Sequence, residues 1–535
     1  MIHMSSISGK INKDFYLRVG SARDFKNRKD YWLYRALEML PGILMWSTFL
    51  GVVAASLFFP FFAAIFIVLF DLYWLLKAVY FSLHLRTSFK KMREYSVIDW
   101  LNKLDGLNLS GHELGVRDWR KDMWHLVIIP YYKEGEDVIR NTIIGLLNTH
   151  YSKDRFIVVL SGEERSGDKG KEIGQTVAQE FGSRFGKFFL TFHPDKAGEV
   201  AGKGANETWA ALQVKEKIID PLKIPYENII VSVFDADTVP AVNYFSRLTY
   251  VYLTTDKPLR KSYQPIPLFV NNIWEAPALA RVIAFSSTFW HMMNQVRPER
   301  LTSFSSQSFP FKALVDLGFW QTNVVSEDSR IFWQGVLGFD GDWQVEPLLV
   351  PVSMDANVAE SFWATMKNLY LQQRRWAYGS ENIPYFLYGF LKNKNISRRM
   401  KFYWVFNILE SFWSWATNSI IIFLMGWLPL LLGGKEFDVT ILAYNTPRFT
   451  RVILTLAMFG IVSSVYLSLL LLPPRPVVYG RHKYLYMVAQ WALIPLTLIF
   501  FGSIPAIDAE TRLMFGKYLG FWPTPKIRKG VQKNF

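Results

Sequence analysis

Two carboxylates, Asp235 and Asp237, follow directly on an apolar run at residues 229–234 and could bind a metal ion. The β-branched and aromatic residues of this run are typical of a buried strand, and open α/β sheets bind ligands at the carboxyl ends of their strands. Residues two positions apart in an extended segment lie on one face. Oxygen ligands placed in this way suit Mg²⁺ or Mn²⁺ carrying phosphate oxygens. A solvated turn would give the same short pattern, so Asp235 and Asp237 indicate a metal site only together with other motifs.

Glu327 and Asp328 form a second acidic pair, after a Ser-rich turn. A sugar hydroxyl is a weak nucleophile at neutral pH, and a carboxylate that accepts its proton accelerates transfer by roughly 10² to 10⁴. Asp328 is therefore a candidate general base, with Glu327 beside it. The alternative is helix capping, because Ser326 and the two acids precede an apolar run.

A third motif, Gln-Gln-Arg-Arg-Trp, occupies residues 372–376. On a helix that begins near Ser361, positions i, i+3 and i+4 share a face, which groups Gln372, Arg375 and Trp376. Arg375 could pair with a leaving diphosphate, and the ring of Trp376 could support the face of a sugar. The alternative is a basic, aromatic helix that lies against a membrane.

Lys203 stands between two glycines in a segment that superficially resembles a phosphate-binding loop. The spacing GxxxxGK[ST] is not met, so we exclude a Walker loop. A lysine beside a helix start still suits a diphosphate as a point charge. Tyr132 and Glu134 end the first expected strand, where they could contact a nucleobase and its ribose.

The composition favours a membrane enzyme. The chain has 535 residues, 50 % of them hydrophobic and 16 % aromatic, and a net charge of +15. Basic clusters adjoin the apolar runs, which indicates anionic lipid head groups rather than nucleic acid. The absence of Cys excludes disulfides, thiolate nucleophiles and Cys-ligated zinc, and the 8 His residues include no HxxxH pair.

Residues 95–394 are expected to form a cytoplasmic α/β domain. Strand-like runs alternate with helical ones, which favours a parallel sheet with helices on both faces. We expect strands at residues 125–130, 156–160, 188–193 and 229–235, and helices at 138–147, 171–181 and 206–214.

Membrane segments are expected on both sides of this domain. The chain divides into a basic cytoplasmic segment (1–38), a transmembrane hairpin (39–86), the α/β domain (95–394), three hydrophobic runs (403–505) and a tail (506–535). Runs 40–59 and 61–83 are each about as long as the ~20 residues of a spanning helix, and their basic flanks indicate that both ends lie inside. Residues 380–401 and 507–522 mix aromatic and basic residues, as helices on a bilayer surface do. We expect an integral inner-membrane protein.

In their order, the DxD, Glu-Asp and QxxRW motifs, flanked by membrane segments, resemble the membrane-embedded inverting glycosyltransferases typified by cellulose, hyaluronan and chitin synthases. The similarity covers residues 124–378. It implies a Rossmann-like GT-A fold, a nucleotide diphosphate sugar and Mg²⁺ or Mn²⁺. It also implies these roles: Asp235 at the nucleotide diphosphate, Asp237 at the metal, Asp328 as base, Lys203 near the nucleotide, and Gln372, Arg375 and Trp376 at the diphosphate and acceptor end.

The tail at residues 521–526 is similar to the FxVTPK gating loop of cellulose synthases, which suggests roles for Phe521, Thr524 and Lys526. Many relatives carry an Asp pair where this chain has Glu163, which is the candidate substitute. If the N-terminus is cytoplasmic and all five hydrophobic runs cross the membrane, the tail lies outside the cell. The basic residues of the tail instead indicate a cytoplasmic position. We therefore predict that run 484–504, interrupted by Pro495 and by the 502–505 segment, does not cross fully.

Two acceptors are compatible with these motifs. The favoured one is a growing β-linked polysaccharide, exported through the transmembrane bundle, because QxxRW occurs together with the gating-like tail. The second is a lipid or lipid-linked acceptor that receives a single sugar, since glucosylceramide synthases carry similar motifs. A transporter or a scaffold without activity is the third hypothesis. The expected partners are a nucleotide sugar (uridine by family default), a glycan or lipid acceptor and the bilayer, with no nucleic acid; an accessory subunit is left open.

Overall fold

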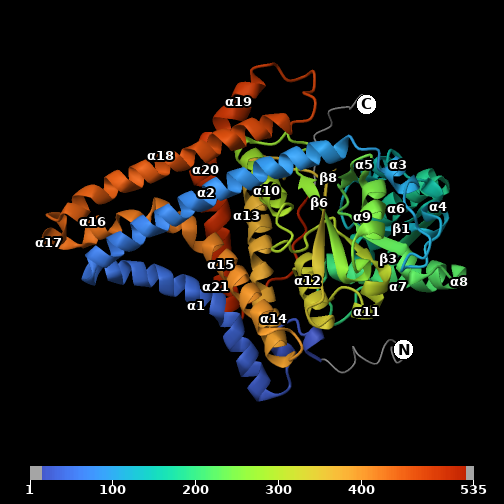
Figure 1. Ribbon diagram of the computed structural model, residues 1–535, viewed down its shortest axis with the longest axis horizontal. Coiled ribbons are helices and arrows are strands. Elements are labelled where there is room, and N and C mark those ends of the chain that lie inside the picture. The colour runs from blue at the N-terminus through green and yellow to red at the C-terminus, as the bar shows by residue number, and fades with distance from the viewer. Residues whose placement is uncertain (1–14, 526–535) are drawn as a thin grey trace.

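The computed structural model describes residues 15–525, and its central element is one eight-stranded mixed sheet (Figure 1). The strand order is β3-β2-β1-β4-β7-β6-β8-β5. The strands are β1 (Trp124–Pro130), β2 (Phe156–Glu163), β3 (Lys187–His193), β4 (Ile229–Val233), β5 (Val239–Pro240), β6 (Lys261–Leu268), β7 (Ser308–Pro310) and β8 (Gln344–Ser353).

The first four strands of this order are parallel, as expected from the sequence. The expectation of a wholly parallel sheet is wrong beyond β4, because β7 pairs with β4 and β6 in antiparallel fashion. Strand β7 is too short to produce an alternating pattern, and β6 contains two prolines, so neither is recognisable in the sequence. The parallel half is the Rossmann-like part of the domain.

Helices cover both faces of the sheet, because alternate residues of β1 point into two separate cores. Leu126 and Ile128 pack with α7, α11, α12 and α14, whereas Val127 and Ile129 pack with α5, α6 and α9. The helices of the domain are α3 (Trp100–Asp105), α4 (Trp119–Asp122), α5 (Glu136–Leu147), α6 (Gly167–Phe181), α7 (Lys203–Val214), α8 (Asp220–Leu222), α9 (Tyr244–Thr254), α10 (Ala278–Asn294), α11 (Phe311–Leu317), α12 (Glu327–Gly338), α13 (Phe362–Ala377) and α14 (Asn382–Lys392).

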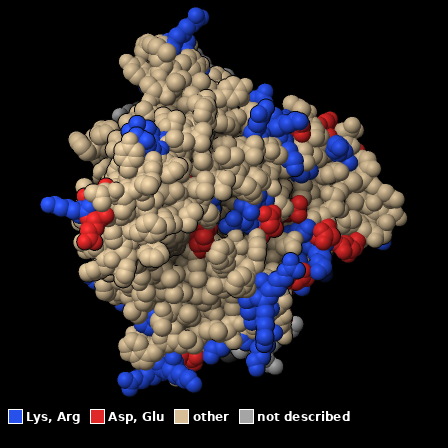
Figure 2. Space-filling model, turned by 60° about the vertical axis from the view of Figure 1, so that its left-hand side comes forward, with Lys and Arg blue, Asp and Glu red and all other residues tan. Residues whose placement is uncertain are grey.

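Two helical hairpins extend from the domain as an arm (Figure 1). They consist of α1 (Arg28–Phe58), α2 (Pro60–Ser96), α15 (Arg398–Phe423), α16 (Leu428–Leu432), α17 (Gly434–Asp438) and α18 (Ile441–Leu470). Both turns meet at the tip, where a Cβ added to Gly433 would lie 2.8 Å from Cβ of Pro60. Figure 2 shows a broad uncharged area with Lys and Arg gathered mainly around its margins.

The arm is apolar enough to lie in a bilayer. Among the described residues, four helices could cross a membrane by length and composition, or five if the α15 and α16 segments, bent by 52°, count as one. The fourth of these is residues 483–514, which comprise α19 (Lys483–Ala489), α20 (Ile494–Thr497) and α21 (Ile504–Met514).

Residues 483–514 contact the domain at both ends. Near the start, Arg281 of α10 donates a hydrogen bond to Gln490 at 2.5 Å. Near the end, Arg374 of α13 forms an ion pair with Asp508 at 3.0 Å. In Figure 1 this segment runs across the base of the arm rather than along it. The tail that follows therefore starts on the same side of the arm as the domain.

The helix α14 differs from the expectation for residues 380–401. Its aromatic side chains Tyr385 and Phe386 are buried in the domain core, rather than turned outward as on a bilayer-surface helix. The ends of the predicted N-terminal segment and tail, residues 1–14 and 526–535, lie outside the described residues, and Lys526 is among them.

Candidate active site

Lys203 stands at the centre of the acidic residues that the sequence singled out. It is the first residue of α7, and its side chain is 11 % exposed. Its ammonium Nζ lies 2.8 Å from Asp235 Oδ1 and 3.0 Å from Asp328 Oδ1. A third carboxylate, Glu207, lies one turn further along α7 with Oε1 at 3.3 Å. One lysine thus joins the end of β4 to the start of α12.

The two glycines beside Lys203 allow other segments to approach closely. A Cβ on Gly204 would lie 2.7 Å from Cβ of Glu327, so the first turns of α7 and α12 come together only because that side chain is absent. A Cβ on Gly202 would lie 2.8 Å from the ring of Phe521. Close packing therefore explains the two glycines that make this segment resemble a phosphate-binding loop.

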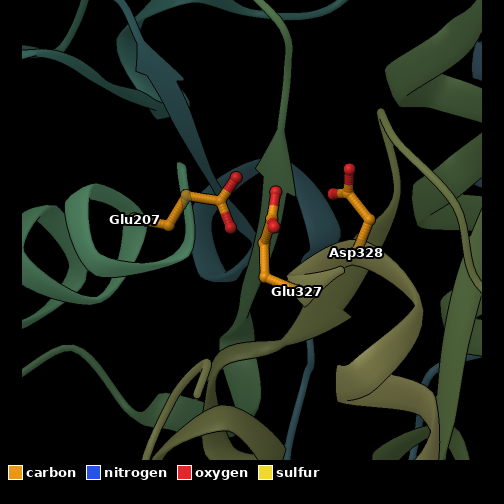
Figure 3. A group of neighbouring side chains, drawn as sticks. All are labelled: Glu207, Glu327 and Asp328. Carbon is orange, nitrogen blue, oxygen red and sulfur yellow. The ribbon is translucent and has the colours of Figure 1, made fainter. Parts of the chain in front are cut away.

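Figure 3 shows three neighbouring carboxyl groups, those of Glu207, Glu327 and Asp328. One oxygen each of Glu207, Glu327 and Asp328 lies within 4.8 Å of the others. Burial, with the charge of Asp328, raises the pKa of Glu327 to about 8. Burial likewise raises the pKa of Glu207, whereas the charges of Asp235 and Asp328 outweigh burial and raise the pKa of Lys203. The group is an ion-paired cluster in which Glu327 keeps its proton at neutral pH.

The acidic pair is held by residues that sequence reasoning missed. The backbone N–H groups of Val325 and Ser326 donate to Glu381 Oε1 at 3.0 and 2.8 Å. Arg330, with no exposed surface, donates to Asn382 at 2.5 Å and to the backbone oxygen of Val19 at 3.1 Å. Ser326, rather than Asp328, occupies the N-cap position of α12.

Asp235 and Asp237 form a donor set that fits a hard divalent cation. Asp235 Oδ2 accepts a hydrogen bond from Ser305 at 2.7 Å. Asp237 is 1 % exposed, and its Oδ2 accepts the backbone N–H of Asp355 at 2.9 Å, which fixes the carboxylate at the end of β4. Mg²⁺ and Mn²⁺ prefer carboxylate oxygens of this kind. Because Nζ of Lys203 lies 2.8 Å from Asp235 Oδ1, a cation bound at this pair would share the Asp235 carboxylate with the ammonium or displace it.

The helix α13 places the QxxRW residues along the same site. Ser361 caps it by accepting the N–H of Ala364 at 3.2 Å. Gln372 accepts a hydrogen bond from Asn357 at 3.4 Å, in the segment that follows β8 and also contains Asp355. Trp376 lies 6.2 Å from the ring of Phe269, centroid to centroid.

Arg375 links α13 to the tail. Its guanidinium lies 5.0 Å from the ring centroid of Phe521, and its charge acts on Glu327. The buried Nε of Arg375 and the buried Oγ1 of Thr524 have no hydrogen-bond partner among the described residues. The tail therefore lies against Arg375 and against Gly202, the residue before Lys203.

The expected nucleotide end lies at the carboxyl edge of β1 and β2. Glu134 accepts the backbone N–H groups of Tyr132 and Lys133 at 2.7 and 3.1 Å, so it stabilises its own turn. Glu163 forms an ion pair with Arg165, whose guanidinium covers the ring of Tyr132 at 4.5 Å. A small cavity beside them is lined by Glu163, Arg165, His193, Lys196 and Glu199.

The structure brings most of the predicted residues into one region. Asp235, Asp328, Glu327 and Lys203 are in contact, and Arg375 and Phe521 join them from α13 and the tail. Asp237 and Gln372 accept hydrogen bonds from Asp355 and Asn357, both in the segment after β8. Trp376 lies against the ring of Phe269. Lys526 lies outside the described residues. The residues missed by the sequence reading are Glu207, Arg330 and Glu381; for Glu207 the available signal was that it is the one acid on α7, one turn after Lys203.

No family model and no curated protein matches the sequence. Among solved structures, the chain is similar to the mannosyltransferase PcManGT from Pyrobaculum calidifontis in complex with GDP-Man and Mn²⁺, at 13 % identity and a TM-score of 0.39, with 84 % of this chain and 100 % of that one covered. It is also similar to S. aureus TarS 1-349 in complex with UDP, at 10 % identity and a TM-score of 0.34, with 74 % and 93 % covered. Likenesses this distant assign neither substrate nor acceptor.

Proposed function

We propose that the protein is a membrane-bound inverting glycosyltransferase that uses a nucleotide diphosphate sugar. The observation that supports this most directly is the convergence of Asp235, Asp328 and Lys203 on one another, within reach of Arg375. Transfer of a sugar from a nucleotide diphosphate needs a carboxylate that acts as general base and cations that face the leaving diphosphate. These groups lie together with a second, strand-end carboxylate at one edge of the Rossmann-like sheet.

The transfer is a single displacement. Asp328 accepts the proton of an acceptor hydroxyl as that oxygen forms a bond to the anomeric carbon. The bond from this carbon to the diphosphate breaks on the opposite side, and its electron pair leaves with the diphosphate, so that an α-linked donor gives a β-linked product. Lys203 and Arg375 face the leaving charge. A Mg²⁺ or Mn²⁺ ion held at Asp237 and Asp235 would neutralise part of that charge.

Lys203 and Asp328 are ion-paired in the described state, at 3.0 Å. Acceptor binding must therefore exchange this ion pair for a hydrogen bond from the sugar hydroxyl. The diphosphate offers the ammonium a replacement partner, so donor and acceptor binding are coupled through Lys203. A donor that arrives first frees the base for the acceptor.

For the acceptor, the helical arm supports a lipid or lipid-linked molecule over an exported polymer. A glycan channel needs helices that enclose a path on all sides. The helix α18 packs on α2 along its length, but only 11 % of its most apolar stretch of 18 residues is buried by the rest of the protein. The arm is therefore open to lipid along α18, and transfer of single sugars to a lipid-borne acceptor fits it better. A growing polysaccharide is the alternative.

We place the domain on the cytoplasmic side. Both hairpin turns lie at the tip of the arm, so the ends of α1, α2, α15 and α18 return to the domain. Basic residues flank these ends, as cytoplasmic flanks do. Segment 483–514 lies at the membrane surface in this arrangement, and four crossings bring the tail back to the cytoplasm.

The deciding experiment measures nucleotide release by the purified protein across a panel of UDP, GDP and other nucleotide sugars, with Mg²⁺ or Mn²⁺ and a membrane-lipid extract. We expect release with one donor, and loss of release in an Asp328→Asn variant that still folds. Mass spectrometry of the product separates one sugar per lipid from a polymer ladder. Absence of release with every donor, or release unchanged in Asp328→Asn, would refute the proposed function.

A further inference from the structure

Asn357 is a buried residue in the segment between β8 and α13, and its side-chain amide is only half paired. It is 7 % exposed, and its Nδ2 donates a long hydrogen bond to Gln372 Oε1 at 3.4 Å. Its Oδ1 is buried and accepts no hydrogen bond from any residue that the structure describes. A buried polar atom without a partner is destabilising, so its presence calls for an explanation such as a bound ligand.

The backbone next to Asn357 is held in place without the help of its side chain. Asn272 donates from Nδ2 to the backbone oxygen of Ala356 at 3.0 Å and accepts the N–H of Ala356 at 2.7 Å. The backbone N–H of Asn271 donates to the backbone oxygen of Met354 at 3.0 Å. Folding therefore fixes this segment through Asn271 and Asn272, and the amide oxygen of Asn357 remains for another group.

Two contacts place Asn357 beside the groups that we expect at the diphosphate. Asp355, two residues before it, donates its backbone N–H to Oδ2 of Asp237 at 2.9 Å. Cα atoms two residues apart are separated by about 7 Å at most, so Asn357 lies near this carboxylate. Its partner Gln372 shares a face of α13 with Trp376, one turn further on. The transferred sugar is bonded directly to the diphosphate and is therefore the ligand expected next to this amide.

We propose that Asn357 is a specificity-determining residue: its Oδ1 accepts a hydrogen bond from a hydroxyl group of the transferred sugar. This inference rests on the proposed glycosyl transfer and adds to it a selection among donor sugars. A hydroxyl group supplies the donor that the amide oxygen lacks, whereas a sugar with hydrogen at that carbon leaves the oxygen buried and unpaired. The site should therefore select donors that carry a hydroxyl group at one position of the sugar over the corresponding deoxy sugars.

Thermal unfolding without substrate separates this role from a purely structural one. Asn272 is the matched control, because it is 5 % exposed and both polar atoms of its amide are paired with Ala356. Asn272→Ala and Asn357→Ala remove the same atoms from buried positions, so the difference between them reports the hydrogen bonds. We expect Asn357→Ala to lower the melting temperature clearly less than Asn272→Ala does, because the oxygen it removes is unpaired.

Donor selectivity is the direct test. Nucleotide release is measured with the nucleotide sugar that is active in the donor panel and with its analogues that each lack one hydroxyl group of the sugar. For one analogue, the wild type should show kcat/KM reduced roughly tenfold, and in Asn357→Ala this ratio should shrink to about twofold. Asn357→Asp keeps an accepting oxygen and should retain most of the selectivity.

Equal selectivity in the wild type and in Asn357→Ala would overturn the proposal. A melting temperature that falls as far in Asn357→Ala as in Asn272→Ala, or failure of Asn357→Ala to fold, would overturn it as well. Increased hydrolysis of the donor with unchanged selectivity would assign the contact to the acceptor instead of the transferred sugar.

Calorimetric binding of the donor panel and its deoxy analogues provides a readout without turnover. Binding that loses its selectivity in Asn357→Ala, with no nucleotide release by the wild type, would refute the transfer reaction but not the hydroxyl contact. Release by the wild type with selectivity unchanged in Asn357→Ala would refute the contact alone. Absence of both release and binding would refute both.

Discussion

Replacement of Lys203 by Met tests whether its ammonium holds the acidic cluster together. The side chain is 11 % exposed and lies 2.8 to 3.3 Å from three carboxylates, so the change leaves buried acids without their cation. Breaking a buried ion pair by removing one partner costs about 3–5 kcal/mol. At roughly 2 °C per kcal/mol for a domain of this size, the melting temperature at pH 8.5 should fall by about 6–10 °C.

The pH dependence of that loss separates charge from packing. The pKa of Lys203 is raised, so in the wild type its contribution is complete below the ordinary lysine pKa and is lost only above it. In Lys203→Met the buried acids Glu207 and Glu327, whose pKa values are raised, must ionise without a cation as pH rises. The loss should therefore be smaller at pH 5.5 than at pH 8.5.

Tryptophan fluorescence of the detergent-solubilised protein during heating measures the melting temperature at each of the two pH values. Lys215→Met is the matched control, because Lys215 forms an ion pair with Asp220, whose side chain is 40 % exposed. Ion pairs that are open to solvent contribute only about 0–1 kcal/mol to the free energy of unfolding. A loss in Lys203→Met that equals the control, or one that is the same at both pH values, would show that the cluster is not stabilised by this charge.

Three further outcomes are expected. Asp328→Asn should lower kcat for nucleotide release by roughly 10² to 10⁴ while calorimetry still detects donor binding; weakened donor binding would contradict a role confined to the base. Glu327 has a pKa of about 8 against an ordinary 4.5, so wild-type stability should decrease as pH rises between these values, by up to about 1.4 kcal/mol per unit, and Glu327→Gln should flatten the thermal-unfolding curve. In this Cys-free chain, a membrane-impermeant maleimide should label Lys435→Cys at the tip of the arm from outside intact cells, and Lys517→Cys only after permeabilisation; external labelling of Lys517→Cys would refute the surface position of segment 483–514.

The sequence predicted the first half of the sheet because its strands are continuous apolar runs. Strands β1 to β4 and helices α5 to α7 lie within a few residues of their expected positions. Strands β5 and β7 have two and three residues, too few for any period to appear. Their pairing depends on contacts between segments far apart in the chain, such as Ser232 with Ser308.

For the site, the spacing of residues in the sequence identified the charged side chains but not the residues that hold those side chains in place. Asp235, Asp328 and Arg375 occur in motifs whose order is informative, and the structure brings them to one region. Glu381 and Arg330 act through hydrogen bonds to the backbone of residues 325–326 and of Val19, and such partners leave no local pattern. The carboxylate of Glu134 caps its own turn, a role that its position after β1 did not indicate.

The N-terminal part of the described chain and the tail contact each other at the base of the arm. Glu38, on α1, accepts a hydrogen bond from the hydroxyl of Tyr518 at 2.8 Å, and the guanidinium of Arg23 covers the ring of Tyr518 at 4.6 Å. Three residues further on, Phe521 contacts Gly202 and faces Arg375. The tail thus contacts α1 on one side and the start of α7, which carries Lys203, on the other. A displacement of the tail at Phe521 must change the space around Lys203, whereas the anchor at Tyr518 keeps the tail at the base of the arm.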